Sequence, residues 1–364
     1  MDSKYLWLLL VWVAGVGIIV NSRQQKNVVQ VGLDYEYRYH MLPAVIMFLP
    51  IVILAGIRKG FGDTEVYRGA FLKLPDRILN IPGYIRNVEK DKGFTVFNII
   101  LKDIIGNRDV VYFLIIAAIC GLCLVITYRK YSCNYMISIL LFIMSGDYIQ
   151  WMFNGIRQFI PVTVIFAMMP WILEKKYGKL IISILLLSTI HATALLMIPV
   201  IFIVQGRAWN KKTIFFIVFV LLSIAFVNQF TNIITNVMEN SQYSNEVGQF
   251  LETQGTSKFR VLVFSVPTFL AYICRNKIGE YKHSIINLCV NMSIMSTGFY
   301  IISMFTSGIF IGRIPIYFSL YNYILLPWEI EHLFTQKSMK LIYILLLGFY
   351  FIFYYYQIVI AWGF

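Results

Sequence analysis

The sequence has few cysteines and few charged residues, and both shortages narrow the classes of protein that it can encode. Of its 364 residues, five are cysteine, 13% are charged and 59% are hydrophobic. The cysteines all fall in or beside apolar segments, so neither a disulfide framework nor a zinc site is indicated. The large apolar fraction indicates a polytopic membrane protein instead.

The chain also lacks the motifs of several soluble enzyme classes. It contains no HExxH, P-loop or GxSxG sequence and no acidic metal cluster, so we expect no metal ion or other cofactor. Acidic residues are scarce, because 18 Asp and Glu stand against 31 Lys and Arg, which gives a net charge of +13. Much of this positive charge sits in short loops, where membrane topology explains it, and nucleic-acid binding is not indicated.

The most informative apolar stretch runs from Leu180 to Val204 and is interrupted near its middle by His191. Basic residues lie at both of its ends: Lys175, Lys176 and Lys179 before it, and Arg207, Lys211 and Lys212 after it. A single crossing would place one of these clusters outside, against the bias that keeps Lys and Arg in cytoplasmic loops. The sequence therefore predicts a re-entrant hairpin that bends at residues 190–192, with arms of about half the membrane depth.

The remaining apolar segments define the rest of the predicted topology. We expect an all-α polytopic protein with about ten full transmembrane helices plus the hairpin. The helices are predicted at residues 5–20, 41–57, 110–128, a segment that begins at 133, 158–173, 213–230, 260–274, 284–306, 314–330 and 341–360. The chain is then a single integral membrane domain, residues 1–364, with both termini outside. Extracytoplasmic loops at about 58–109 and 231–259 carry apolar residues at helical spacing, which predicts amphipathic helices there.

Four arginines stand at the predicted outer rim of the membrane: Arg58, Arg157, Arg260 and Arg313. A single arginine at such a place can simply bind lipid phosphates at a helix end. Several of them beside an intramembrane bend favour a functional anion site, because the guanidinium stays charged and binds phosphate oxygens in pairs. A diphosphate-linked lipid in the outer leaflet would present such oxygens.

Two further polar residues each have a structural and a functional interpretation. His191 is either a neutral imidazole bonded to a nearby hydroxyl or a functional group, because an ionisable residue inside a membrane is costly. Asp63 follows Arg58 after a glycine-containing turn. It either belongs to an ordinary solvated turn or orients a sugar hydroxyl or an arginine at the mouth of a cavity.

Five short blocks follow one another along the chain: Ala55–Asp63 with Tyr67, Lys92–Phe94, Asn154–Gln158, Ser188–Leu195, and Gly312–Phe318 followed by Leu325–Pro327. In order and spacing they resemble the signatures of the EpsG family of Wzy-type polysaccharide polymerases. The resemblance covers most of the chain. One departure is at Thr64-Glu65, where the family often has an aromatic residue.

The resemblance implies a metal-independent membrane glycosyltransferase of GT-C-like architecture in the bacterial inner membrane. Such an enzyme joins oligosaccharide repeat units carried on undecaprenyl diphosphate at the outer face, and makes exopolysaccharide, capsule or O-antigen. Arg157 and Arg313 would stabilise the leaving diphosphate, and His191, or in second place Asp63, would accept the proton of the attacking hydroxyl. The same resemblance places five residues around the lipid diphosphate and sugar: Arg58, Arg260, Gln158, Tyr67 and Tyr317.

Two other functions remain open. A flippase for lipid-linked oligosaccharides would also need basic residues, but we expect them along the whole pore rather than at one rim. A membrane O-acyltransferase would also use an intramembrane histidine, but its cavity should open toward the cytoplasm, where the acyl donor is. Membrane lipid and a chain-length regulator are the further expected partners.

Overall fold

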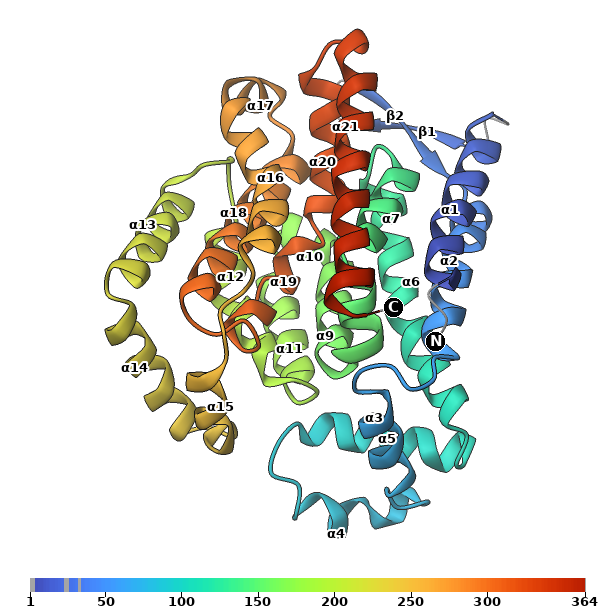
Figure 1. Ribbon diagram of the computed structural model, residues 1–364, viewed down its shortest axis with the longest axis vertical. Helices are drawn as coiled ribbons and strands as arrows, with labels where there is room; N and C mark the ends of the chain where they lie inside the picture. Colours follow the sequence, from blue (N-terminus) through green and yellow to red (C-terminus); the bar gives the residue numbers. More distant parts are fainter. Residues whose placement is uncertain (1–3, 23–25, 32–33, 364) are drawn as a thin grey trace. The chain divides into compact units, whose positions relative to one another are not determined.

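The computed structural model describes residues 4–363 except 23–25 and 32–33, and most of them are helical (Figure 1). The chain forms two compact units: residues 1–195 together with 330–364, and residues 196–329. The predicted helical membrane protein is confirmed at this level. The prediction of one domain over residues 1–364 stays a prediction, and the two units are described in turn.

Among the described residues, four helices are long and apolar enough to cross a membrane: α1 (Lys4–Ser22), α6 (Asp109–Tyr131), α18 (Ser284–Phe305) and α21 (Gln336–Tyr355) with its π-helical end η6 (Tyr356–Ala361). Three bent pairs raise the number to seven if each is one span: α7 (Tyr135–Met144) with α8 (Asp147–Ile149) and η2 (Gln150–Asn154), α13 (Lys211–Ala225) with α14 (Val227–Glu239), and α16 (Lys258–Ile273) with α17 (Arg275–Tyr281). The bends are 71°, 99° and 72°. The total of ten stays a prediction.

The other predicted spans are short or broken. The helix α2 (Met41–Gly56) has 16 residues. Residues 158–173 are divided between α9 (Ile156–Ala167) and α10 (Met169–Leu173). Residues 314–330 follow η5 (Ile311–Arg313) and are divided between α19 (Ile316–Ser319) and α20 (Asn322–Leu333). Interruptions inside a membrane require protein or water around the freed backbone groups. They therefore indicate that these segments are buried in protein or face a cavity.

The apolar stretch around His191 is broken where the sequence predicts. The helix α11 (Tyr177–Ser188) has 12 residues and is followed by a turn at residues 189–191. The chain continues as η3 (Ala192–Leu196) and α12 (Met197–Ile203). Each helix is too short to cross the hydrocarbon region alone. The break is confirmed, and the return of the chain to the cytoplasmic side stays a prediction.

In the first unit, α2 packs against α6, and α1 and α9 flank this pair. Glycine makes the close approach of α2 and α6 possible. A Cβ on Gly56 would lie 2.2 Å from the Leu114 side chain, and one on Gly121 would lie 2.5 Å from that of Val52. Small residues at helix contacts are typical of membrane bundles, where close packing replaces the hydrophobic driving force.

No regular element is predicted between the first two spans, but the structure has an antiparallel hairpin there, of β1 (Lys26–Val31) and β2 (Asp34–Tyr39). The buried Arg38 at the end of β2 donates from Nε to the Lys130 carbonyl at 3.0 Å and from Nη1 to the Ser132 carbonyl at 2.7 Å. These carbonyls are at the end of α6, which a cation stabilises. The predicted all-α membrane class is confirmed, and among the described residues this hairpin is its one exception.

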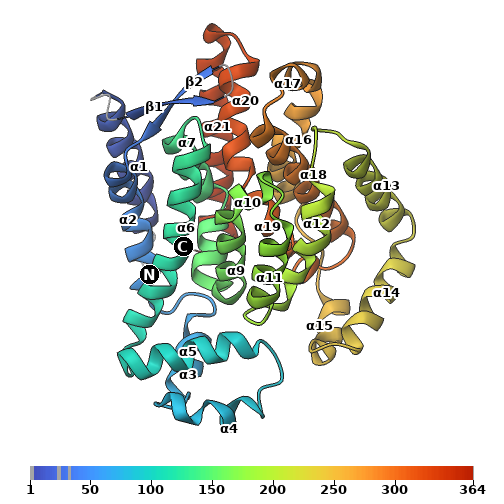
Figure 2. The same cartoon turned by 180° about the vertical axis from the view of Figure 1, so that it is seen from behind.

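The long loop at 58–109 folds into a helical layer. It contains α3 (Thr64–Leu72), η1 (Ile78–Asn80), α4 (Ile81–Ile85) and α5 (Lys92–Ile105). Both ribbon views show α3, α4 and α5 at the end of the first unit opposite to the β-hairpin (Figures 1 and 2). The predicted amphipathic helix is α5, because Phe94 and Leu101 are buried while Ile104 is exposed.

Two cationic side chains hold this layer together. Lys102 of α5 is buried, and its Nζ donates to the carbonyls of Leu72 at 2.7 Å and Leu74 at 2.5 Å at the end of α3. Arg68 of α3 binds Glu65 and also Asp109, the first residue of α6, at 2.5 Å. These hydrogen bonds raise the pKa of Arg68. The layer is therefore fixed to α6 rather than free in solution.

In the second unit, α16 and α13 both pack against α18. Hydroxyl groups join the first pair, because Thr268 Oγ1 lies 2.7 Å from both Ser293 Oγ and Thr297 Oγ1. The polar excursion at 231–259 contains the rest of α14, η4 (Ser244–Glu246) and α15 (Val247–Glu252). The predicted amphipathic helix there is the C-terminal part of α14, where Ile233 and Val237 are exposed and Met238 is buried.

Candidate functional site

An aspartate that sequence reasoning missed joins two of the predicted site residues. Asp91 precedes α5 with a left-handed backbone, φ 53°, and its side chain is 1% exposed. Its Oδ2 lies 3.1 Å from Arg157 Nε and 3.3 Å from His191 Nδ1. A non-glycine residue with positive φ is uncommon, although aspartate tolerates it better than most. One carboxylate thus connects the 58–109 layer, the start of α9 and the turn after α11.

The backbone next to Asp91 fixes this arrangement. The Gly93 N–H donates to the Thr189 carbonyl at 2.8 Å, which joins the first turn of α5 to the turn that carries His191. A Cβ on Gly93 would lie 2.1 Å from Thr189 Oγ1, so no side chain fits between the two segments. Arg157 is set by α9, whose helix begins at Ile156, directly after Gly155.

The hydrogen bond to Asp91 determines which nitrogen of His191 can act as a base. When the Nδ1–H donates to the carboxylate, Nε2 keeps its lone pair and can accept a proton. The Arg157 side chain is 32% exposed, so part of the guanidinium faces away from the ion pair. The cluster of Asp91, Arg157 and His191 can therefore remove a proton and hold an anion in one place.

Arg58 is more enclosed than the sequence predicts. It is 2% exposed, its Nε donates to Thr64 Oγ1 at 3.2 Å, and its guanidinium lies 4.0 Å from the centre of the Phe113 ring. Burial lowers its pKa to about 10, so it stays charged at neutral pH. In this structure Arg58 holds the turn after α2, and its contact with a diphosphate stays a prediction.

The turn that carries Asp63 packs against the third sequence block. The Asp63 N–H donates to Asn154 Oδ1 at 3.1 Å, and Asn154 lies three residues before Arg157. A Cβ on Gly62, whose φ is +48°, would lie 1.6 Å from the same oxygen. The carboxylate that contacts His191 is thus Asp91, while Asp63 positions its turn through the backbone. Its predicted role as an alternative base stays a prediction.

Two other predicted residues of the first unit lie on neighbouring elements. The Tyr67 ring on α3 meets the Phe94 ring edge-on, with the centroids 6.4 Å apart, and Phe94 belongs to the first turn of α5. Gln158 is the residue after Arg157 on α9 and is buried. Both stay predictions as contacts of the substrate.

The other two predicted arginines belong to the second unit, near the start of α16. Hydrogen bonds join the residues before α16 to the end of α18, because the Thr256 N–H donates to the Ser303 carbonyl at 3.0 Å. A Cβ on Gly312 would lie 2.6 Å from Thr256 Oγ1, so Gly312 and Arg313 lie beside the start of α16. Arg260 is in the first turn of this helix. Arg313 is exposed, and the predicted sugar contact Tyr317 is buried in α19.

Asp91 was missed because it looks like part of a solvated loop. Its neighbours alternate in charge along Glu89-Lys90-Asp91-Lys92, and such a run usually faces water. The available signal was its position, immediately before the Lys92–Phe94 block. Over the described part of the chain, no group of three or more His, Cys, Asp or Glu side chains is placed to hold a metal ion.

The fold and the site define a class: a multi-pass helical membrane protein with an aspartate–histidine pair and an arginine where the 58–109 layer meets a break between apolar helices. A model of the EpsG family matches residues 41–362, and the chain belongs to this family. The resemblance of the five sequence blocks is thereby confirmed. The family is associated with Wzy-type polymerases, which indicates a polysaccharide polymerase-type role for this chain. No curated protein and no solved structure matches the chain.

Proposed function

We propose that this protein polymerises oligosaccharide repeat units linked to undecaprenyl diphosphate at the outer face of the bacterial inner membrane. The observation that carries the proposal is the bridge from Asp91 to Arg157 and His191, at 3.1 and 3.3 Å. It places a base beside a cation that suits phosphate oxygens. Membership of the EpsG family supports the same class of reaction.

In the proposed reaction, a hydroxyl oxygen of the acceptor sugar forms a bond to the anomeric carbon of the donor. The bond from that carbon to the diphosphate oxygen breaks, and undecaprenyl diphosphate leaves with the electron pair. His191 Nε2 takes the hydroxyl proton, and Asp91 stabilises the imidazolium that forms. A positioned base of this kind contributes about 10²–10⁴-fold to the rate.

The charge that develops on the leaving diphosphate needs cations close to it. Arg157 supplies one beside His191, because preorganised charges of opposite sign are the strongest source of transition-state stabilisation. The same role for Arg260 and Arg313 rests on the sequence alone. Arginine is suited to this role, since its planar guanidinium binds two phosphate oxygens at once. The proposed reaction needs no metal ion, because these arginines carry the compensating charge.

The test is a reconstitution of the purified protein in liposomes with a lipid-linked repeat unit. The proposal expects the wild type to form polymer, and His191→Gln, Arg157→Ala and Arg313→Ala each to leave single repeats on the lipid. The matched control is His40→Gln, which removes an exposed histidine at the start of α2. Normal chain lengths from the His191 variant would contradict the proposal.

The same preparation distinguishes the two other functions. Movement of the lipid-linked repeat across the bilayer without polymer would identify a flippase. Transfer of an acyl group to the sugar from an added thioester would identify an O-acyltransferase. Either result would replace the proposed polymerase.

A further inference from the structure

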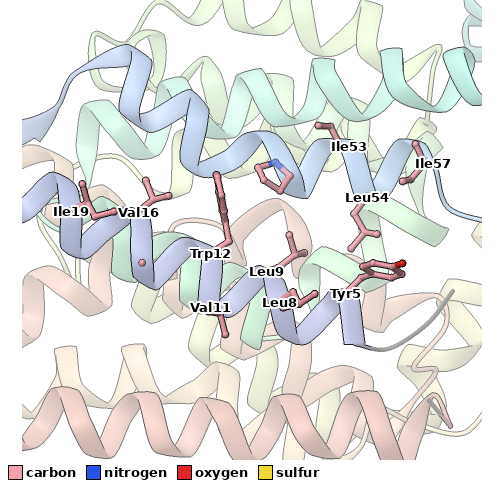
Figure 3. Close-up of a pocket in the computed structure, with 12 residues that line it drawn as sticks. Tyr5, Leu8, Leu9, Val11, Trp12, Val16, Ile19, Ile53, Leu54 and Ile57 are labelled. Atoms are coloured by element: carbon pink, nitrogen blue, oxygen red, sulfur yellow. The ribbon is translucent and has the colours of Figure 1, made fainter.

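An apolar groove runs between α1 and α2 in the first unit (Figure 3). Its volume is about 650 Å³, within the range of about 300–1,000 Å³ that is typical of ligand pockets. The residues that line it lie at positions 5–19 and 50–57, and none of them is charged. Trp12 reaches across from α1 and donates from Nε1 to the Ile46 carbonyl of α2 at 3.2 Å.

The groove stays open because two of its residues leave space. Gly15 faces it with no side chain, and a Cβ added there would meet no atom within 4 Å. Pro50 contributes a compact ring from inside α2. If a space of this size were empty, the side chains that line it would lose dispersion contacts. In a membrane, a hydrocarbon chain is the occupant that restores them.

One end of the groove lies next to the turn that begins at Arg58. Tyr5 and Ile57 lie together at that end in Figure 3, and Arg58 follows Ile57 directly. The turn after Arg58 contacts Asn154, three residues before Arg157. A lipid whose chain lay in the groove would thus have its head group at the turn that leads to the arginine of the site.

We infer that the groove between α1 and α2 binds the polyprenyl chain of the lipid-linked substrate, with its diphosphate directed toward the Arg58 turn. This inference rests on the proposed function. An ordinary phospholipid is the competing occupant, but nothing would then require the groove to end beside the sequence blocks of the site. The family match begins at residue 41, so α1 supplies one wall of the groove from outside the matched residues.

Gly15→Trp tests the inference, because its Cβ would meet no atom within 4 Å and its ring would occupy the groove. The matched control is Gly348→Trp on α21, an exposed glycine on another candidate span that also has nothing within 4 Å. A polyprenyl chain that is displaced from the groove stays among lipid tails, which are equally apolar. It therefore loses only its packing contacts and its restraint. We therefore expect Gly15→Trp to raise the KM for the lipid-linked repeat about three- to tenfold, and Gly348→Trp to leave it unchanged.

A second measurement does not depend on polymer formation. A polyprenyl phosphate with a photoreactive chain, added to the protein in nanodiscs, should label residues 5–19 and 50–57. Unlabelled polyprenyl diphosphate should remove this label, and excess phosphatidylglycerol should not. Gly15→Trp should lose the label, while Gly348→Trp keeps it.

The outcomes separate the groove from the proposed function. Specific labelling in a protein that makes no polymer would support the groove and overturn the polymerase. Polymer formation without labelling, or labelling that phosphatidylglycerol displaces equally well, would overturn the groove and leave the polymerase standing. An unchanged KM in Gly15→Trp would also count against the groove.

Discussion

Replacing Asp91 with asparagine is the sharpest perturbation of the site. The change removes one negative charge and keeps the size of the side chain, and asparagine also tolerates the left-handed backbone at φ 53°. The lost charge faces both Arg157 and His191. Because the imidazolium is no longer stabilised and Nδ1–H is no longer fixed, we expect the rate constant kcat to fall about 10²–10⁴-fold.

The same substitution should affect binding and folding differently from catalysis. A hydrogen bond to a charged group contributes about 1.5–3 kcal/mol, and the 32% exposure of the Arg157 side chain puts its pair with Asp91 at the lower end. The protein should therefore still fold, with a lower unfolding temperature. Arg157 would no longer be neutralised by a carboxylate, so the KM for the lipid diphosphate should stay the same or fall.

The assay is polymer formation with the purified variant, analysed as separate kcat and KM values beside a thermal unfolding curve. Asp103→Asn is the control, because Asp103 is exposed near the other end of α5. A kcat for Asp91→Asn within threefold of the wild type would refute the reasoning. So would a fall in kcat accompanied by a higher KM and a large loss of stability, which a merely structural role predicts.

Three further predictions test the elements that support the site. Lys102→Met removes two hydrogen bonds to the end of α3, so the free energy of unfolding should fall by about 1–3 kcal/mol. Proteolysis of the 58–109 layer should become faster, and an unchanged rate of cleavage would contradict this prediction. Arg38→Ala leaves the last carbonyls of α6 without their cation, and chemical denaturation should show a loss of about 1–3 kcal/mol, independent of pH between 6 and 9. In a cysteine-free background, cysteines at Lys179 and Lys211 should both react with a membrane-impermeant reagent from the cytoplasmic side. Reaction from opposite sides would refute the hairpin.

Apolar length and basic residues predicted much of the fold, because both reflect a physical requirement of the membrane. The break at His191 followed from charge on both sides of one apolar stretch, and the amphipathic helix α5 followed from spacing. The β-hairpin was missed although the run Tyr35-Glu36-Tyr37-Arg38-Tyr39 alternates with the period of a strand. Its shortness and its polar surroundings made it look like a loop.

The site was harder to predict than the spans. Arg157 and His191 were found because a charge inside or beside the membrane is costly and therefore informative. Asp91 carries no such signal in sequence, since burial of a loop carboxylate is decided by the fold of α3–α5 around it. Arg58 shows the converse, because its charge was noticed but the ring of Phe113 that covers it comes from α6, distant in sequence.

The contact of Gly93 with Thr189 has a consequence for how a substrate enters. The 2.8 Å hydrogen bond and the absence of room for a side chain tie the start of α5 to the turn before His191. A displacement of the start of α5 would break this hydrogen bond and disturb the turn that carries His191, so α5 is poorly suited to act as a lid. In the proposed polymerase, sugars would then enter past other elements, and the contact between Asp91 and His191 would stay assembled between successive additions to a growing chain.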